Sequence, residues 1–76
     1  MPRFFFDARN GVDARDAEGR ELPDAAAAQR AAVTVAASYA SCPDRLIDEG
    51  VIVVSVRDEA DLVVATVRLA CLVEAA

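Results

Sequence analysis

The 76-residue sequence contains no histidine, no lysine and no tryptophan. Without histidine the chain lacks the usual general base and the most common zinc ligand. The two cysteines, Cys42 and Cys71, form no C-x-x-C motif and are too few for a disulfide scaffold. We therefore expect reduced thiols, no metal site and no cofactor.

Long hydrophobic runs are missing as well. No apolar segment approaches the roughly 20 residues of a membrane-spanning helix. Near the start of the sequence, Phe4–Phe6 are followed at once by Asp7, and so short an apolar stretch does not make the core of a signal peptide. These absences predict a cytoplasmic protein without a membrane partner.

Negative charge predominates, because eight arginines stand against thirteen acidic residues and the net charge is −5. This balance disfavours non-specific binding of nucleic acid but leaves room for a local basic patch. Hydrophobic residues make up 55% of the chain, yet seventeen of them are alanine, which buries little area. We expect one small domain, residues 1–76, whose thin core comes from valine, leucine, isoleucine and the N-terminal phenylalanines.

Residues 3–9 predict a β-strand whose even-numbered side chains point toward the core. Asn10-Gly11 then marks a hairpin turn. A two-residue loop would direct the charged residues of the next strand inward. A three-residue loop pairs Ala8 with Val12 and directs Val12 and Ala14 inward, so this loop is favoured.

Residues 16–24 form a connector, in which Gly19 supplies a turn and Asp24 is placed to cap a helix. The helical pattern runs from Ala25 to about Ser41. Its inner stripe consists of Ala25, Ala28, Ala32, Val35, Ala36 and Tyr39, with Cys42 continuing it. We expect Pro43 to end the helix and residues 44–49 to add one short helical turn, closed by Gly50.

The clearest pattern is a pair of β-rich runs, residues 51–57 and 62–69, around the polar segment 58–61. A four-residue loop pairs Val54 with Ala65 and gives both strands a consistent inner face. That face carries Ile52, Val54, Val56, Val63, Ala65, Val67 and Leu69.

These elements predict an α+β fold, an antiparallel three- to four-stranded sheet in ββαββ order with one helix packed on one face. The strand order second, first, third, fourth makes every neighbour antiparallel. This order brings the helix end and the last strand end together, so the α-carbons of Cys42 and Cys71 should lie within about 12 Å. The tail, residues 70–76, either extends the last strand or packs at the helix end.

Three stretches carry a resemblance to a known family. They are Met1-Pro2-Arg3-Phe4-Phe5-Phe6, Arg9-Asn10-Gly11 and Asp16-x-x-Gly19-x-Glu21-Leu22-Pro23-Asp24-x-x-Ala27-Ala28. These residues resemble a family of small bacterial proteins known only as a domain of unknown function, and the resemblance implies strands flanking one helix but no activity. The element order is also similar to that of HicB-type antitoxins, a likeness of fold alone.

Segments that imitate catalytic or metal-binding motifs fail on their context. Residues 58–61 spell D-E-A-D but accompany no phosphate-binding loop, so a charged hairpin turn is favoured. A calcium loop with Gly19 as its sixth residue would begin at Ala14, which has no side-chain oxygen to bind the ion. The neighbouring acids Asp48 and Glu49 have no expected pocket to raise a pKa. We expect no enzymatic activity.

One constellation remains, on the predicted outer face of the sheet. Its members, the candidate binding face, are Arg3, Phe5, Arg9, Arg15, Arg57 and Arg68. Only Asp7 and Asp13 are expected to balance the arginines. Such a face is one way to bind single-stranded RNA or DNA. A solvated face, on which Arg15 shields Phe5, is favoured over that interpretation.

The sequence thus predicts a non-catalytic interaction or regulatory module with a protein partner, first of all a second copy of itself. A dimer would add buried area to a thin core, and the sheet edges together with Leu72 and Val73 offer that area. The alternative is a module that binds single-stranded nucleic acid through the arginine face.

Overall fold

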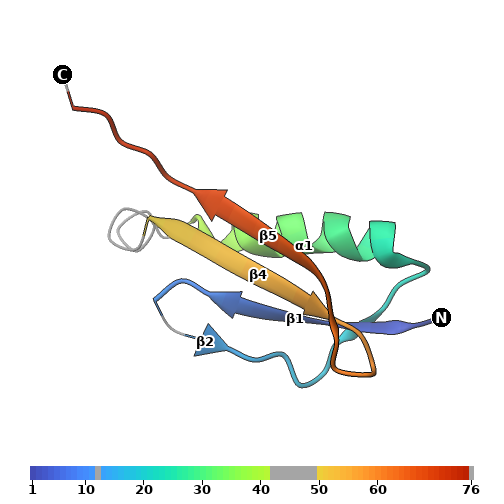
Figure 1. The fold of residues 1–76 in the computed structure, drawn as a ribbon. Coiled ribbons are helices and arrows are strands. Elements are labelled where there is room, and N and C mark those ends of the chain that lie inside the picture. Colours follow the sequence, from blue (N-terminus) through green and yellow to red (C-terminus); the bar gives the residue numbers. More distant parts are fainter. Residues whose placement is uncertain (12, 42–49, 76) are drawn as a thin grey trace.

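The computed structural model describes residues 1–11, 13–41 and 50–75. Its elements are β1 (Arg3–Arg9), β2 (Asp13–Ala14), β3 (Arg20–Glu21), α1 (Ala25–Tyr39), β4 (Val51–Arg57) and β5 (Val63–Ala70). Helix α1 lies along one face of an antiparallel sheet, and the residues after β5 extend away from the sheet (Figure 1). The predicted α+β architecture is confirmed.

The main strands are ordered β2-β1-β4-β5, and every neighbouring pair is antiparallel, as predicted. An additional strand, β3, pairs with the first part of β1, with Arg3 opposite Glu21. The Leu22 N–H extends this pairing by donating to the Pro2 carbonyl oxygen at 3.0 Å. The sequence did not predict β3, because two residues are too few for an alternating pattern to appear.

The hydrophobic core lies between the sheet and α1. Its buried members are Phe4, Phe6, Ala8, Ala28, Ala32, Ala36, Ile52, Val54 and Val56. The alanines let α1 lie close to the sheet, mainly over β4 and β5. Ala65, Val67 and Leu69 face the same core but stay half-buried, because β5 is an edge strand.

Helix α1 begins as predicted, since Asp24 Oδ1 accepts a hydrogen bond from the Ala27 N–H at 2.8 Å. It ends at Tyr39 rather than near Ser41 as predicted. The next residue, Ala40, caps this end, because its N–H donates to the Ala37 carbonyl oxygen at 3.1 Å. The roles predicted for Cys42, Pro43 and residues 44–49 lie outside the described residues, as does the proximity of Cys42 to Cys71. Within the described ranges, no helix is long and apolar enough to cross a membrane.

The pairing of β1 with β2 differs from the prediction by two residues. Ala8 pairs with Ala14 instead of Val12, and Arg9 pairs with Asp13. The observed register places Arg9 Nε 3.0 Å from Asp13 Oδ1, an ion pair that the predicted register does not bring face to face. Ala14 keeps its predicted side of the sheet but is exposed, because α1 covers β4 and β5 rather than β2.

The turn between β4 and β5 is the charged hairpin turn that residues 58–61 predicted. The Asp61 N–H donates to the Asp58 carbonyl oxygen at 3.0 Å, and the Asp58 N–H donates to the Leu62 carbonyl oxygen at 2.9 Å. Asp61 has φ +64°, a left-handed conformation that aspartate tolerates better than most residues. The loop is therefore tighter than the predicted four-residue loop.

The register of β4 and β5 is also corrected by two residues, because Val54 pairs with Val67 rather than with Ala65. A β-bulge follows, since Val56 faces Ala65 while Arg57 faces Val63, which leaves Val64 as the extra residue. Val63 consequently lies on the outer face with Arg57, whereas the sequence placed it on the inner face. A bulge reverses which alternate side chains of a strand face the core, and the alternation of polar and apolar residues in the sequence does not reveal where this happens.

Val54 tests the assignment of the inner face, because its side chain is fully buried beneath α1. We expect Val54→Asp to lower the free energy of unfolding by about 4 kcal/mol or more, since an unpaired charge would be buried. Val53→Asp is the matched control, because Val53 lies beside it on the outer face near arginines. Urea denaturation followed by circular dichroism measures both, and equal losses would contradict the assignment.

Candidate functional site

The outer face of the sheet, opposite α1, forms an open concavity of about 790 Å³. Four arginines and three aspartates line it, namely Arg9, Arg15, Arg57, Arg68, Asp7, Asp13 and Asp61. Four members of the predicted binding face therefore do share one face. Asp61 was not expected there, and with it the face carries nearly balanced charge.

Arg57 is the buried centre of this face, with a side chain only 11% exposed. Its Nε donates to Asp7 Oδ2 at 2.7 Å and its Nη2 donates to Asp7 Oδ1 at 3.3 Å. Nη1 donates to Asp61 Oδ1 at 3.3 Å, and Nη2 also donates to the main-chain oxygen of Asp16 at 2.6 Å. We call Arg57, Asp7, Asp16 and Asp61 the Arg57 cluster. It joins β1, β4, the segment between β2 and β3, and the β4–β5 turn.

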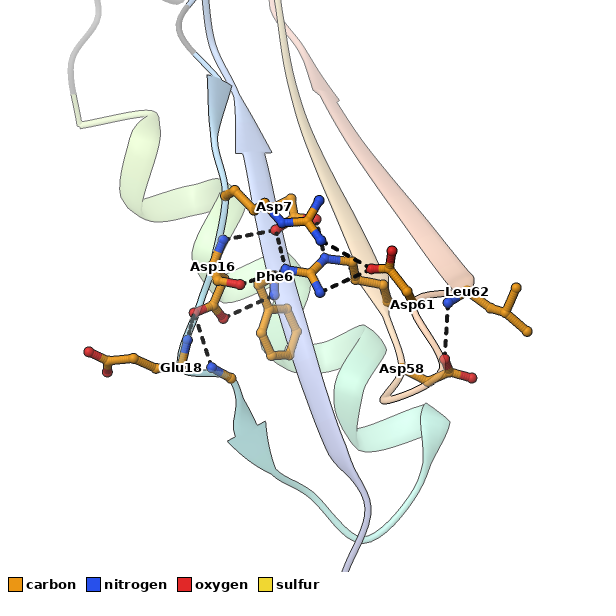
Figure 2. Close-up of polar contacts among 10 residues, drawn as sticks. Phe6, Asp7, Asp16, Glu18, Asp58, Asp61 and Leu62 are labelled. Atoms are coloured by element: carbon orange, nitrogen blue, oxygen red, sulfur yellow. Dashed lines mark hydrogen bonds and ion pairs between the residues drawn. The ribbon is translucent and has the colours of Figure 1, made fainter.

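Asp16 organises the segment between β2 and β3, as Figure 2 shows. Its Oδ1 accepts hydrogen bonds from the Glu18 and Gly19 N–H groups at 3.0 and 3.1 Å. Its Oδ2 accepts from the Phe6 N–H at 3.1 Å, and its own N–H donates to Asp7 Oδ1 at 2.8 Å. The Asp16 carboxylate therefore fixes the turn and holds it against β1.

These contacts move the pKa values of Asp7, Asp16 and Arg57 away from neutrality. Desolvation by burial raises the pKa of Asp7, but the hydrogen bonds from Arg57 and the Asp16 N–H, with the charges of Arg57 and Arg15, lower it by more. Desolvation likewise opposes the main-chain hydrogen bonds that lower the pKa of Asp16. The hydrogen bond to Asp7 raises the pKa of Arg57 above its already high value.

The other predicted arginines are paired too, apart from one. Arg3 lies at the far end of β1, where its Nη1 donates to the Glu18 carbonyl oxygen at 2.7 Å and its Nη2 is 3.6 Å from Glu21 Oε1. Arg9 pairs with Asp13, and Arg15 Nη2 donates to Asp61 Oδ1 at 3.2 Å. Among the described residues, Arg68 has no ion-pair partner, although it lines the same concavity.

Phe5 is not an open aromatic platform. It is half-buried, and the Arg57 guanidinium carbon lies 4.7 Å from the centre of its ring. The covering cation is thus Arg57, not Arg15 as the sequence suggested. Gly19 approaches from another side, because a Cβ atom built on it would lie 2.9 Å from ring atoms of Phe5. Cation and glycine together reduce the ring surface available for stacking.

A second feature of this face is the free edge of β5. The Cys71 N–H donates to the Gly50 carbonyl oxygen at 3.0 Å, so odd-numbered residues of β5 turn their main-chain groups toward β4. The main-chain groups of Thr66, Arg68 and Ala70 therefore point away from the sheet. No strand among the described residues pairs with this edge.

Exposed apolar side chains occur at both ends of the same strand. The described residues include seven large hydrophobic side chains that are exposed, and five of them lie between residues 62 and 73. These five, the edge patch, are Leu62, Val63, Val64, Leu72 and Val73. The tail was predicted to extend the last strand or to pack at the helix end, but only Ala70 belongs to β5, and Leu72 and Val73 beyond it are 84% and 72% exposed.

Sequence reasoning missed Asp16 and Asp61 as partners of Arg57. The spacing of Arg57 and Asp61 was a usable signal, because a tight hairpin turn brings residues four apart close together. Asp16 gave a weaker signal in Asp16-x-x-Gly19, where an aspartate followed by glycine is typical of a side-chain-capped turn. The Val63-Val64 pair carried no signal that separated a bulge from a regular strand.

Gly19 offers a test of this packing. It has φ +70°, and a Cβ atom would lie 2.8 Å from the Phe4 carbonyl oxygen as well as against the Phe5 ring. Gly50 is the matched control, since it has φ +77° with open space around it. We expect Gly19→Ala to cost at least about 1 kcal/mol more than Gly50→Ala, measured by urea denaturation. Equal costs would mean that the Gly19 segment does not pack on β1.

The Arg57 cluster predicts acid sensitivity. The pKa values of Asp7 and Asp16 are lower in the folded chain, so the unfolded chain binds more protons in the acidic range. Their stabilisation is complete above the unfolded value of about 3.9 and is lost as pH falls through the folded values. Urea midpoints between about pH 6 and pH 2 should therefore decline toward acid.

Asp7→Asn should lower the urea midpoint at neutral pH and flatten this acid decline, because one of the shifted carboxyl groups is gone. Asp13→Asn is the control, since the Asp13 side chain is 80% exposed and, within the part of the chain that the structure describes, pairs only with the exposed Arg9. An acid decline in Asp7→Asn as steep as in the parent chain would contradict the assigned role of Asp7.

Comparison with known proteins gives one match. A family model described as a domain of unknown function (DUF6894) matches residues 3–70, which takes in β1 to β5. No curated protein and no solved structure matches the chain. The match thus takes in the stretches that carry the resemblance from Arg3 onward and continues through the C-terminal hairpin, and the chain belongs to the DUF6894 family of domains of unknown function.

Proposed function

We propose that this protein is a non-catalytic interaction module that associates with a second copy of itself through the β5 side of the sheet. The observation that carries the proposal is the unpaired edge of β5, which has the exposed apolar side chains of the edge patch at its two ends. Burial of apolar area is the main favourable term in association.

The two edges of the sheet support this choice of surface, because they are unlike each other. At the β1 edge, β2 and β3 pair with the two ends of β1, and the Asp16 carboxylate accepts the Phe6 N–H between them. At the other edge, β5 has eight residues, no proline and a single charged residue, Arg68. A long edge strand with so little charge is a template for pairing with another strand.

The titration behaviour of the outer face supports a role without catalysis. General acid–base catalysis near neutral pH needs groups whose pKa values lie near neutrality. In the Arg57 cluster, the pKa values of Asp7 and Asp16 are lowered and that of Arg57 is raised. These shifts suit permanent ion pairs rather than proton transfer.

Binding of single-stranded nucleic acid through the arginine face is the alternative. In its favour, Arg9, Arg15, Arg57 and Arg68 line one concavity. Against it, three of these arginines already pair with aspartates, and Phe5 is covered by Arg57. Phosphates would have to displace carboxylates in a chain of net charge −5, which weakens this alternative.

Analytical ultracentrifugation of the full chain tests self-association. We expect the mass to rise with concentration from 8.0 kDa to about twice that value. Val64→Lys should weaken association about tenfold or more, because it puts a desolvated charge at the edge. Val33→Lys is the matched control, since Val33 is an exposed valine that belongs to α1 and not to the β5 edge.

Two results would overturn the proposal. One is an 8.0 kDa species alone up to high micromolar concentration. The other is tight binding of a labelled single-stranded RNA by the monomer, with an affinity that falls steeply as salt rises, which would favour the alternative.

A further inference from the structure

The free edge of β5 is compatible with only a few ways of pairing with an identical strand. Thr66, Arg68 and Ala70 direct their main-chain groups outward, so these even-numbered residues form the hydrogen-bonded pairs of any antiparallel contact. An even-numbered residue of one copy must then lie opposite an even-numbered residue of the other, and an odd-numbered residue opposite an odd-numbered one. Every such register keeps the half-buried inner residues, Ala65 and Val67 among them, on the α1 side of both copies.

Charge selects among these registers. Pairing centred on Arg68 would bring two arginines face to face, which is unfavourable. Pairing centred on Thr66 places Arg68 opposite Val64 of the second copy and keeps the two Arg68 residues about 13 Å apart along the strands. Thr66 would then face Thr66 across the two-fold axis, and such threonine pairs are favourable cross-strand contacts.

The same register gives Arg68 an acidic neighbour. Antiparallel pairing brings the C-terminal half of β5 beside the partner's β4–β5 turn, which carries Asp58, Glu59 and Asp61 and no basic residue. Asp61 and Arg68 line the same outer concavity within one copy, so Arg68 approaches the partner's Asp61 on that face. The Asp61 side chain is 65% exposed and retains room for a further donor.

We propose that two copies join their sheets through antiparallel β5–β5 pairing, with Thr66 at the two-fold axis and Arg68 of each copy beside the partner's acidic β4–β5 turn. This inference rests on the self-association proposed above and specifies its surface and register. Val64 of the edge patch lies two residues from the axis, opposite Arg68 of the second copy. The two outer concavities become neighbours on one continuous sheet.

Cysteine cross-linking in solution tests the register, in a background with Cys42→Ser and Cys71→Ser. Thr66→Cys should form a disulfide-linked dimer readily under mild oxidation, because hydrogen-bonded partners have α-carbons about 5.5 Å apart. Val67→Cys is the matched control, since its own copy lies diagonally at about 7–8 Å, beyond the reach of a disulfide. Non-reducing electrophoresis measures both.

A charge reversal gives a second measurement. Arg68→Glu should weaken self-association about tenfold. Arg30→Glu makes the same change of net charge on the exposed surface of α1 and should leave association unchanged. Equal affinities for these two variants would overturn the pairing of Arg68 with the acidic turn.

The outcomes separate this inference from the proposed function. A dimer in the ultracentrifuge with cross-linking of Val67→Cys but not Thr66→Cys would overturn the register alone. A dimer that neither variant cross-links would overturn β5 pairing while self-association stands. A chain that stays monomeric would overturn both.

Discussion

The conformation of the outer face depends on the partly buried guanidinium of Arg57. A buried cation is costly unless its donors are satisfied, and Arg57 finds acceptors on Asp7, Asp61 and the main chain of Asp16. These acceptors come from a central strand, a turn and a loop that are far apart in the sequence. The loop containing Asp16 binds β1 through the Phe6 N–H and the Asp7 carboxylate, and Arg57 ties the same loop to β4 and the β4–β5 turn.

The family-like segment from Asp16 to Asp24 acquires a physical explanation from these contacts. Asp16 caps the turn, Gly19 permits both the left-handed backbone and the close approach to Phe5, and Asp24 caps α1. All three residues therefore act in folding. The segment that resembles the family therefore attaches β3 and α1 to β1, and its residues do not indicate what ligand the protein binds.

The sequence was sufficient for the features that repeat along the chain. Alternation predicted β1, β4 and β5, and the alanine stripe predicted the buried face of α1, because Ala28, Ala32 and Ala36 recur at helical spacing. It was insufficient for features that occur once. The two-residue strand β3 and the bulge at Val64 depend on single tertiary contacts. The charge balance of the arginine face depends on Asp61, because the tight β4–β5 turn places this residue on that face.

The edges of the sheet follow from the same distribution of polar contacts. The hydrogen bonds of Asp16, β2 and β3 satisfy the free edge of β1, where Arg57 also binds the segment that contains Asp16. Among the described residues, no strand pairs with the free edge of β5 in the same way. Helix α1 covers the inner face of β5 only in part, because β5 is the edge strand, and Ala65, Val67 and Leu69 stay half-buried. An identical strand placed across a two-fold axis supplies both missing components, hydrogen-bond partners for Thr66 and Arg68 and apolar cover for the inner residues. The arrangement that closes one edge of the sheet within the chain thus leaves the other edge suited to a second copy.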